Sequence, residues 1–116
     1  MTVFSEPDDD LSPARVAELH ASGEVVVIDV REPYEHEAGR IAGARHIPLE
    51  RLASEADTVP RDRQVVFHCR LGARSAMATR AFRAAGYDAY NMAGGISAWV
   101  EHGLPIAPDG GSVADH

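Results

Sequence analysis

Two segments of the chain are apolar almost without interruption, and each has the length of a strand. "EVVVIDV" (24–30) and "QVVFHC" (64–69) are rich in β-branched residues and show no alternation of apolar and polar positions. Such runs are typical of strands buried on both faces, as in a parallel sheet. Two shorter segments, around 44–47 and at "YDAYNM" (87–92), are predicted as further strands.

Helical patterns lie between these strands. In "LSPARVAELHASG", Ser12 is a suitable N-cap, Pro13 suits the first helical position and Gly23 is a stop signal. The other predicted helical segments are a single turn begun by Pro33, an amphipathic helix over 48–57, and a final helix over 94–103 with Ile96, Trp99 and Val100 inward.

The clearest helix spans 74–86 and ends at a glycine. Apolar residues recur on one side of it and polar residues on the other, which predicts an amphipathic helix. The predicted buried face consists of Met77, Ala78, Ala81, Phe82 and Ala85, and the predicted exposed face of Thr79, Arg80 and Arg83.

Strands therefore alternate with helices along the chain, which is the pattern of an α/β fold with a mostly parallel sheet. In such folds, ligands bind beyond the carboxyl ends of the strands. The only cysteine of the chain, Cys69, stands at such an end. The alternation thus predicts both the fold class and the place of the chemistry.

The length of 116 residues suits one compact domain. The acidic residues 1–10 and the Pro/Gly/Asp-rich residues 107–116 are expected to be flexible, which leaves a domain over 11–106. No apolar run approaches the ~20 residues needed to span a bilayer, and the acidic start is unlike a signal peptide. We therefore expect a cytoplasmic protein with no membrane partner.

Charge and cysteine content exclude several classes of function. The formal net charge of −7 argues against a nucleic-acid partner, which requires a basic surface. A single cysteine excludes an internal disulfide, C-x-x-C redox chemistry and a cysteine-rich zinc site. The six histidines show no metal-ligand spacing, so we expect no metal and no cofactor.

The loop "CRLGARS" (69–75) joins a predicted strand to a predicted helix. A tight loop in this place directs several backbone N–H groups into one concavity, and the helix N-terminus adds about half a positive charge. Arg70 and Arg74 add full charges, while Gly72 permits the turn. These features favour the thiolate of Cys69 over the thiol and predict a nucleophilic sulfur beside a pocket for an oxyanion.

A structural interpretation of the same residues stays open. Free cysteines are most often inert and buried, and Arg70 and Arg74 could be solvated surface charges. The combination of cysteine, glycine and two arginines at a strand–helix junction favours the reactive interpretation.

Three blocks of sequence, in this order, resemble the rhodanese family, the thiosulfate:cyanide sulfurtransferases. They are "VIDVREPYEHEAGRIAGARHIPL", the cysteine loop, and "MAGGISAWVEHGLPI", and the resemblance covers roughly residues 10–106. It implies a three-layer fold in which helices flank both faces of an about five-stranded parallel sheet.

The resemblance also implies a reaction. Cys69 attacks the outer sulfur of a small anionic donor such as thiosulfate, becomes a persulfide, and passes the sulfur to cyanide, a thiol or a sulfur-accepting protein. Asp29 and Arg31 would be mainly structural, Glu35 would brace a loop, and His68 would be a core or supporting residue. The persulfide cradle implied by position is Arg70, Leu71, Gly72, Ala73, Arg74 and Ser75.

The chain departs from the family pattern in the turn "GRIAGA", where Arg40 and Ala42 replace the usual residues. We expect altered packing or rim charge there and no loss of activity. Two other functions remain as alternatives. One is a sulfur-carrying or regulatory module without turnover. The other is a phosphatase or arsenate reductase, which is disfavoured because four residues, and not five, separate Cys69 from Arg74.

Overall fold

The computed structural model describes residues 9–116 and contains one five-stranded, all-parallel sheet with strand order β1-β5-β4-β2-β3. The strands are β1 (Asp10–Leu11), β2 (Val25–Asp29), β3 (Arg45–His46), β4 (Gln64–His68) and β5 (Ala89–Met92). The helices are α1 (Pro13–Ala21), α2 (Pro33–Ala38), α3 (Leu49–Leu52), a 3-10 turn η1 (Ala56–Thr58), α4 (Ala73–Ala84) and α5 (Gly95–Glu101).

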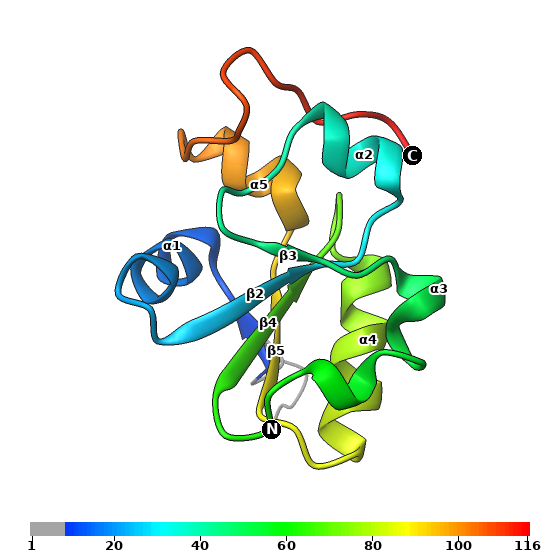
Figure 1. The fold of residues 1–116 in the computed structure, drawn as a ribbon. Coiled ribbons are helices and arrows are strands. Elements are labelled where there is room, and N and C mark those ends of the chain that lie inside the picture. Colours follow the sequence, from blue (N-terminus) through cyan, green and yellow to red (C-terminus); the bar gives the residue numbers. More distant parts are fainter. Residues whose placement is uncertain (1–8) are drawn as a thin grey trace, which may run out of the picture.

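Helices cover both faces of the sheet, as Figure 1 shows: α1 and α5 lie on one side, α3 and α4 on the other. Each face of the sheet has its own apolar core, and successive side chains of the central strands point alternately into one core and the other. In β4, Val65 and Phe67 pack toward α3 and α4, whereas Val66 packs toward α1 and α5. Both faces of β4 are therefore apolar, which is why its sequence shows no alternation. The predicted three-layer α/β fold is confirmed.

The register of the two central strands positions the site. β2 and β4 pair in parallel over their full length, with Asp29 opposite His68. The carboxyl ends of both strands therefore reach the same edge of the sheet, and the segments that follow them, beginning at Val30 and at Cys69, start side by side. A backbone hydrogen bond joins the two strand ends directly, since the amide of Val30 donates to the carbonyl of His68 at 3.0 Å.

Three predicted helices differ from the structure. The segment 48–57 is not one helix, because it divides into α3 and η1. In α4 the buried stripe is Ser75, Ala78, Thr79 and Phe82, so it is shifted from the predicted face, and Met77 is 55% exposed. Burial of the two hydroxyls is possible because both are hydrogen-bonded; that of Thr79, for example, donates to the carbonyl of Ser75 at 2.8 Å. In α5, Val100 is likewise 41% exposed and not inward.

Strand β1 was not expected from the pattern, since two residues are too few to show a periodicity. The predicted flexible segment 1–10 lies mostly outside the described residues, but its last two residues adjoin the sheet. The carbonyl of Asp9 accepts a hydrogen bond of 2.7 Å from the amide of Asn91, and Asp10 pairs with the same residue in the β1–β5 ladder.

Residues 107–116, expected from composition to be a flexible tail, return across the molecule to α2, as the red trace in Figure 1 shows. Arg40 and Ala107 exchange two backbone hydrogen bonds of 2.8 and 2.7 Å, and the amide of Ser112 donates to the carbonyl of Ala38 at 2.8 Å. Backbone hydrogen bonds thus hold in place a segment whose sequence shows no helical or strand periodicity. Within residues 9–116, no helix is long and apolar enough to cross a membrane.

The shifted face of α4 predicts a contrast between two residues that the sequence pattern treats alike. Phe82 is buried between Phe67 and Tyr87, with ring centroids 4.9 and 4.7 Å away. Phe82→Ala should lower the free energy of unfolding by about 3–5 kcal/mol. Met77→Ala should change it by less than about 1 kcal/mol. Urea unfolding of both variants measures the difference, and equal losses would contradict the packing described above.

Candidate active site

Cys69 follows β4 directly and lies on the side of the sheet that α3 and α4 cover. The loop then turns through Gly72, whose φ of 111° is in the left-handed region that favours glycine, and α4 begins at Ala73. Strand, glycine turn and helix N-terminus thus follow one another within five residues, as the sequence predicted.

Backbone amides converge on the sulfur of Cys69. The amide nitrogens of Gly72 and Ser75 lie 3.1 and 3.5 Å from Sγ, and the hydroxyl of Ser75 lies 3.3 Å from it. Cys69 is almost fully buried, yet it lines a cavity of about 230 Å³ with Arg70, Leu71, Ala73, Arg74 and His116. The sulfur is therefore held by N–H donors at the floor of a small cavity that an atom bonded to it could occupy.

The N-terminus of α5 sets the direction of two further amides of the loop, those of Arg70 and Leu71. The amides of Ile96 and Ser97 donate to the carbonyls of Cys69 and Arg70 at 2.9 and 3.1 Å. In a trans peptide the C=O and the following N–H point in opposite directions, so the N–H groups of Arg70 and Leu71 point away from α5. A Cβ on Gly95 would lie 2.4 Å from the carbonyl oxygen of Arg70. Gly95, the first residue of α5, is therefore required by this close backbone contact.

The hydroxyl of Ser75 belongs to a chain of hydrogen bonds that leads away from the sulfur. It lies 2.6 Å from Oδ1 of Asn91, and Nδ2 of Asn91 donates to Asp10 at 3.1 Å. An ionised carboxylate only accepts hydrogen bonds, so Asp10 orients the amide with its carbonyl toward Ser75. The single hydroxyl proton of Ser75 thus has three candidate acceptors, Oδ1 of Asn91 at 2.6 Å, the carbonyl of Gly72 at 3.2 Å and Sγ at 3.3 Å, whereas the two backbone amides have no competing acceptor in this network.

Arg74 is paired with Glu35 of α2. Its guanidinium donates two hydrogen bonds to the fully buried carboxylate, at 2.9 and 3.0 Å, and the amide of Glu32 adds a third at 2.9 Å. Burial raises the pKa of Glu35, but the hydrogen bonds from Arg74 and Glu32 outweigh burial and hold the pKa below its ordinary value. Glu35 therefore ties the cysteine loop to α2, in agreement with the bracing role expected for it.

Asp29 and Arg31 form a second buried pair at the end of β2. The carboxylate of Asp29 accepts from Nε and Nη2 of Arg31 at 2.9 and 2.7 Å, and Nη2 also donates to the carbonyl of Gly39. Burial raises the pKa of Asp29, but the hydrogen bonds and charge of Arg31, with the neighbouring histidines His68 and His36, hold it well below its ordinary range. Both residues are completely buried, which fits the structural role expected for them.

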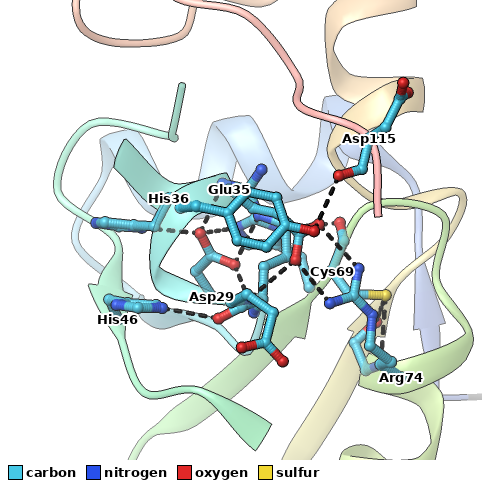
Figure 2. A network of polar contacts seen from close by, with 12 residues as sticks. Asp29, Glu35, His36, His46, Cys69, Arg74 and Asp115 are labelled. Carbon is cyan, nitrogen blue, oxygen red and sulfur yellow. Dashed lines mark hydrogen bonds and ion pairs between the residues drawn. The ribbon is translucent and has the colours of Figure 1, made fainter. Parts of the chain in front are cut away.

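Three histidines lie close to this pair, and Figure 2 labels two of them, His36 and His46. His36 contacts Asp29 through Nδ1 at 2.9 Å and stacks on His46 with ring centroids 4.3 Å apart. His68 is fully buried, burial lowers its pKa, and its Nδ1 lies 3.2 Å from the carbonyl of Cys69. His68 therefore contacts the backbone of the nucleophile and not its sulfur, as expected for a supporting residue.

Of the predicted loop, Arg70, Leu71, Ala73 and Arg74 line one cavity with Cys69, whereas Gly72 and Ser75 contact the sulfur without lining that cavity. The structure also gives the two arginines partners that the sequence did not reveal. Arg74 is engaged by Glu35, and Arg70 points outward, where Nη2 lies 3.3 Å from Asp115. Sequence reasoning also missed Asn91 as a contact of Ser75, and it missed His116 in the cavity wall. No local pattern marks these residues, because each acts through a neighbour that is distant in sequence.

Comparisons with known proteins agree with this geometry. A model of the rhodanese-like domain family matches residues 12–102. A sulfurtransferase of Allochromatium vinosum is 38% identical over 110 residues, which cover 93% of this chain and 100% of the relative. An HTH-type transcriptional regulator of Mycobacterium tuberculosis is 35% identical over 117 residues, which cover 98% of this chain and 50% of the relative. The crystal structure of a rhodanese-related protein from Thermoplasma volcanium has a TM-score of 0.79 and 32% identity, covering 84% of this chain and 96% of that one.

The chain therefore belongs to the rhodanese-like domain family. The sulfurtransferases among its relatives support a role in sulfur transfer.

The close contact at the start of α5 predicts a matched pair of glycine substitutions. Gly95 and Gly103 both have positive φ, 63° and 77°, but only Gly95 has backbone where a Cβ would lie. Gly103→Ala should cost about 1–2 kcal/mol in free energy of unfolding, the strain of a left-handed residue. Gly95→Ala should cost about 2 kcal/mol more, because the loop must also shift. Urea unfolding measures both, and equal costs would show that the contact with Arg70 is unimportant.

The Glu35–Arg74 pair predicts a pH-dependent contribution to stability. Glu35→Gln should lower the free energy of unfolding at pH 7 by about 3 kcal/mol, since it leaves a largely buried guanidinium without its counter-charge. The pKa of Glu35 is lowered on folding, so this contribution is fully present above the unfolded pKa of about 4.3 and is lost as the pH falls through the folded pKa.

The difference between wild type and Glu35→Gln should therefore shrink below about pH 4.3. Unfolding in urea at several pH values measures it. Glu37→Gln is the matched control, because Glu37 lies in the same helix and is exposed. A difference that stays constant down to pH 3 would contradict the lowered pKa.

Proposed function

We propose that this protein is a sulfurtransferase in which Cys69 carries a sulfane sulfur as a persulfide. The observation that supports the proposal most directly is the convergence of the Gly72 and Ser75 amides on Sγ at the floor of a cavity. Hydrogen bonds and a helix N-terminus aimed at the sulfur favour its anionic form, which is the form that attacks.

The first half-reaction uses a small anionic donor, with thiosulfate as the example. The thiolate of Cys69 attacks the outer sulfur, a new S–S bond forms at Cys69, and the S–S bond of thiosulfate breaks with its electron pair leaving on sulfite. The outer sulfur of the persulfide then lies in the cavity. The N–H groups of Arg70 and Leu71, which point away from α5, are free to donate to it, and this stabilises the charge that develops there.

The second half-reaction regenerates the enzyme. Cyanide or a thiolate attacks the outer sulfur, the persulfide S–S bond breaks, and its electron pair returns to Cys69. Thiocyanate or a new persulfide leaves. No proton has to be moved by a side chain in either step, which agrees with the position of His68 away from Sγ. Because the chain has one cysteine, the acceptor must be external, and this requires ping-pong kinetics.

A second candidate is sulfur carriage or sensing without turnover. It is favoured by the relative from Mycobacterium tuberculosis, a transcriptional regulator of which this chain spans half. The phosphatase alternative is weaker, because four residues between Cys69 and Arg74 form a small ring, and Arg74 is already bound by Glu35. A tetrahedral oxyanion would need that guanidinium.

Treatment with thiosulfate should add one sulfur atom to Cys69, as measured by mass spectrometry of the intact protein and of the peptide that contains this residue. Cys69→Ser should gain nothing. If wild type shows no gain with thiosulfate or with a small-molecule persulfide, the proposal is wrong.

Turnover separates the two sulfur-handling candidates. A sulfurtransferase should release thiocyanate continuously from thiosulfate and cyanide, whereas a carrier should give a single stoichiometric burst. If the protein instead hydrolyses an aryl phosphate, and Cys69→Ser loses that activity, the phosphatase alternative is supported.

A further inference from the structure

The segment 107–116 follows the part of the chain that the family model matches, and it ends at the mouth of the Cys69 cavity. Beyond its backbone pairing with Arg40 and Ala38, it is held by two side-chain contacts. Val113 packs against the core formed with α1 and α5, and the hydroxyl of Tyr34 donates to the carbonyl of Asp115 at 3.0 Å (Figure 2). The position of Asp115 is therefore fixed by its backbone and does not depend on its own side chain.

Asp115 lies between two residues that line the cavity: its carboxylate Oδ1 is 3.3 Å from Nη2 of Arg70, and it precedes His116 in the chain. Its side chain is 96% exposed and that of Arg70 is 30% exposed. An ion pair so exposed contributes little to stability. Its consequence is electrostatic, because it places a negative charge beside one of the two arginines that line the cavity.

This arrangement changes the charge that an incoming ligand meets. Glu35 pairs with Arg74 and Asp115 with Arg70, so each guanidinium that lines the cavity has a carboxylate beside it, which reduces its attraction for an anion. The attraction for an anion then comes from the loop amides and the N-terminus of α4. An anion at the rim must compete with Asp115 for Arg70, and each additional negative charge on it is repelled by the carboxylate.

We propose that Asp115 is a specificity-determining residue that makes the Cys69 cavity discriminate by charge. It disfavours dianionic sulfur donors such as thiosulfate relative to donors with one charge or none, such as the persulfides of small thiols. The assignment of donors rests on the proposed function. The charge discrimination is a property of the cavity and applies to any reagent that reaches Cys69.

Alkylation of Cys69 tests the discrimination without requiring any enzymatic activity. Iodoacetate and iodoacetamide are close in size but differ by one negative charge, and the chain has one thiol, so loss of that thiol reports a single site. Both reactions are run at the same pH. The readout is the ratio of the two alkylation rates.

Asp115→Asn should raise the iodoacetate rate relative to the iodoacetamide rate at low salt by up to about fivefold, which is the effect of one unit charge at about 4 Å in water. The change should shrink in 1 M salt, where the screening length is about 3 Å. Asp109→Asn is the matched control, because Asp109 is exposed in the same segment and its removal changes the net charge equally. The control should leave the ratio unchanged.

An unchanged ratio in Asp115→Asn, or the same change in Asp109→Asn, would overturn the proposal. So would equal acceleration with both reagents, since that would show that the substitution merely opens the cavity.

In steady state, Asp115→Asn should lower KM for thiosulfate severalfold while kcat changes little. If neither protein turns over thiosulfate, the donor assignment fails with the proposed function, and the alkylation ratio still decides the charge discrimination.

Discussion

Backbone contact between α5 and the cysteine loop is the constraint on which the candidate site depends. The first amides of α5 hold the carbonyls of Cys69 and Arg70, and peptide planarity then turns the following N–H groups the other way. The loop can come this close only because Gly95 has no Cβ. Gly95, more than twenty residues after the cysteine, thus helps to set the direction of the loop backbone at Cys69 and Arg70.

Side-chain charges around the sulfur are arranged as pairs. Asp29 binds Arg31, Glu35 binds Arg74, and Asp115 binds Arg70. The arginines of the loop therefore do not supply the free positive charge that their sequence position suggests. What remains to favour an anion is the set of oriented amides and the N-terminus of α4, which are fixed in place by the fold and need no rearrangement when charge develops.

Two acidic residues outside the segment matched by the family model reach the loop from different sides. Asp10 orients Asn91 and through it the hydroxyl of Ser75, and Asp115 pairs with Arg70. Neither touches the sulfur. Asp10 acts on Ser75, which contacts the sulfur, and Asp115 acts on Arg70, which lines the cavity. Residues outside the matched segment can therefore adjust the surroundings of Cys69 while the sequence of the loop stays the same.

The sequence by itself determined the central strands, the helix after the cysteine and the place of the chemistry. The unbroken apolar runs of β2 and β4 predicted buried parallel strands, and the order strand, cysteine, glycine, helix predicted the loop and its amides, because these features depend on residues that are adjacent in the chain. Tertiary structure decided the partners. The Glu35–Arg74 pair joins residues 39 positions apart and exists because β2 and β4 end at the same edge. The burial of Ser75 in place of Met77 and the return of Asp115 toward Arg70 depend on hydrogen bonds made across the fold, and the periodicity of a single segment carries no information about such contacts.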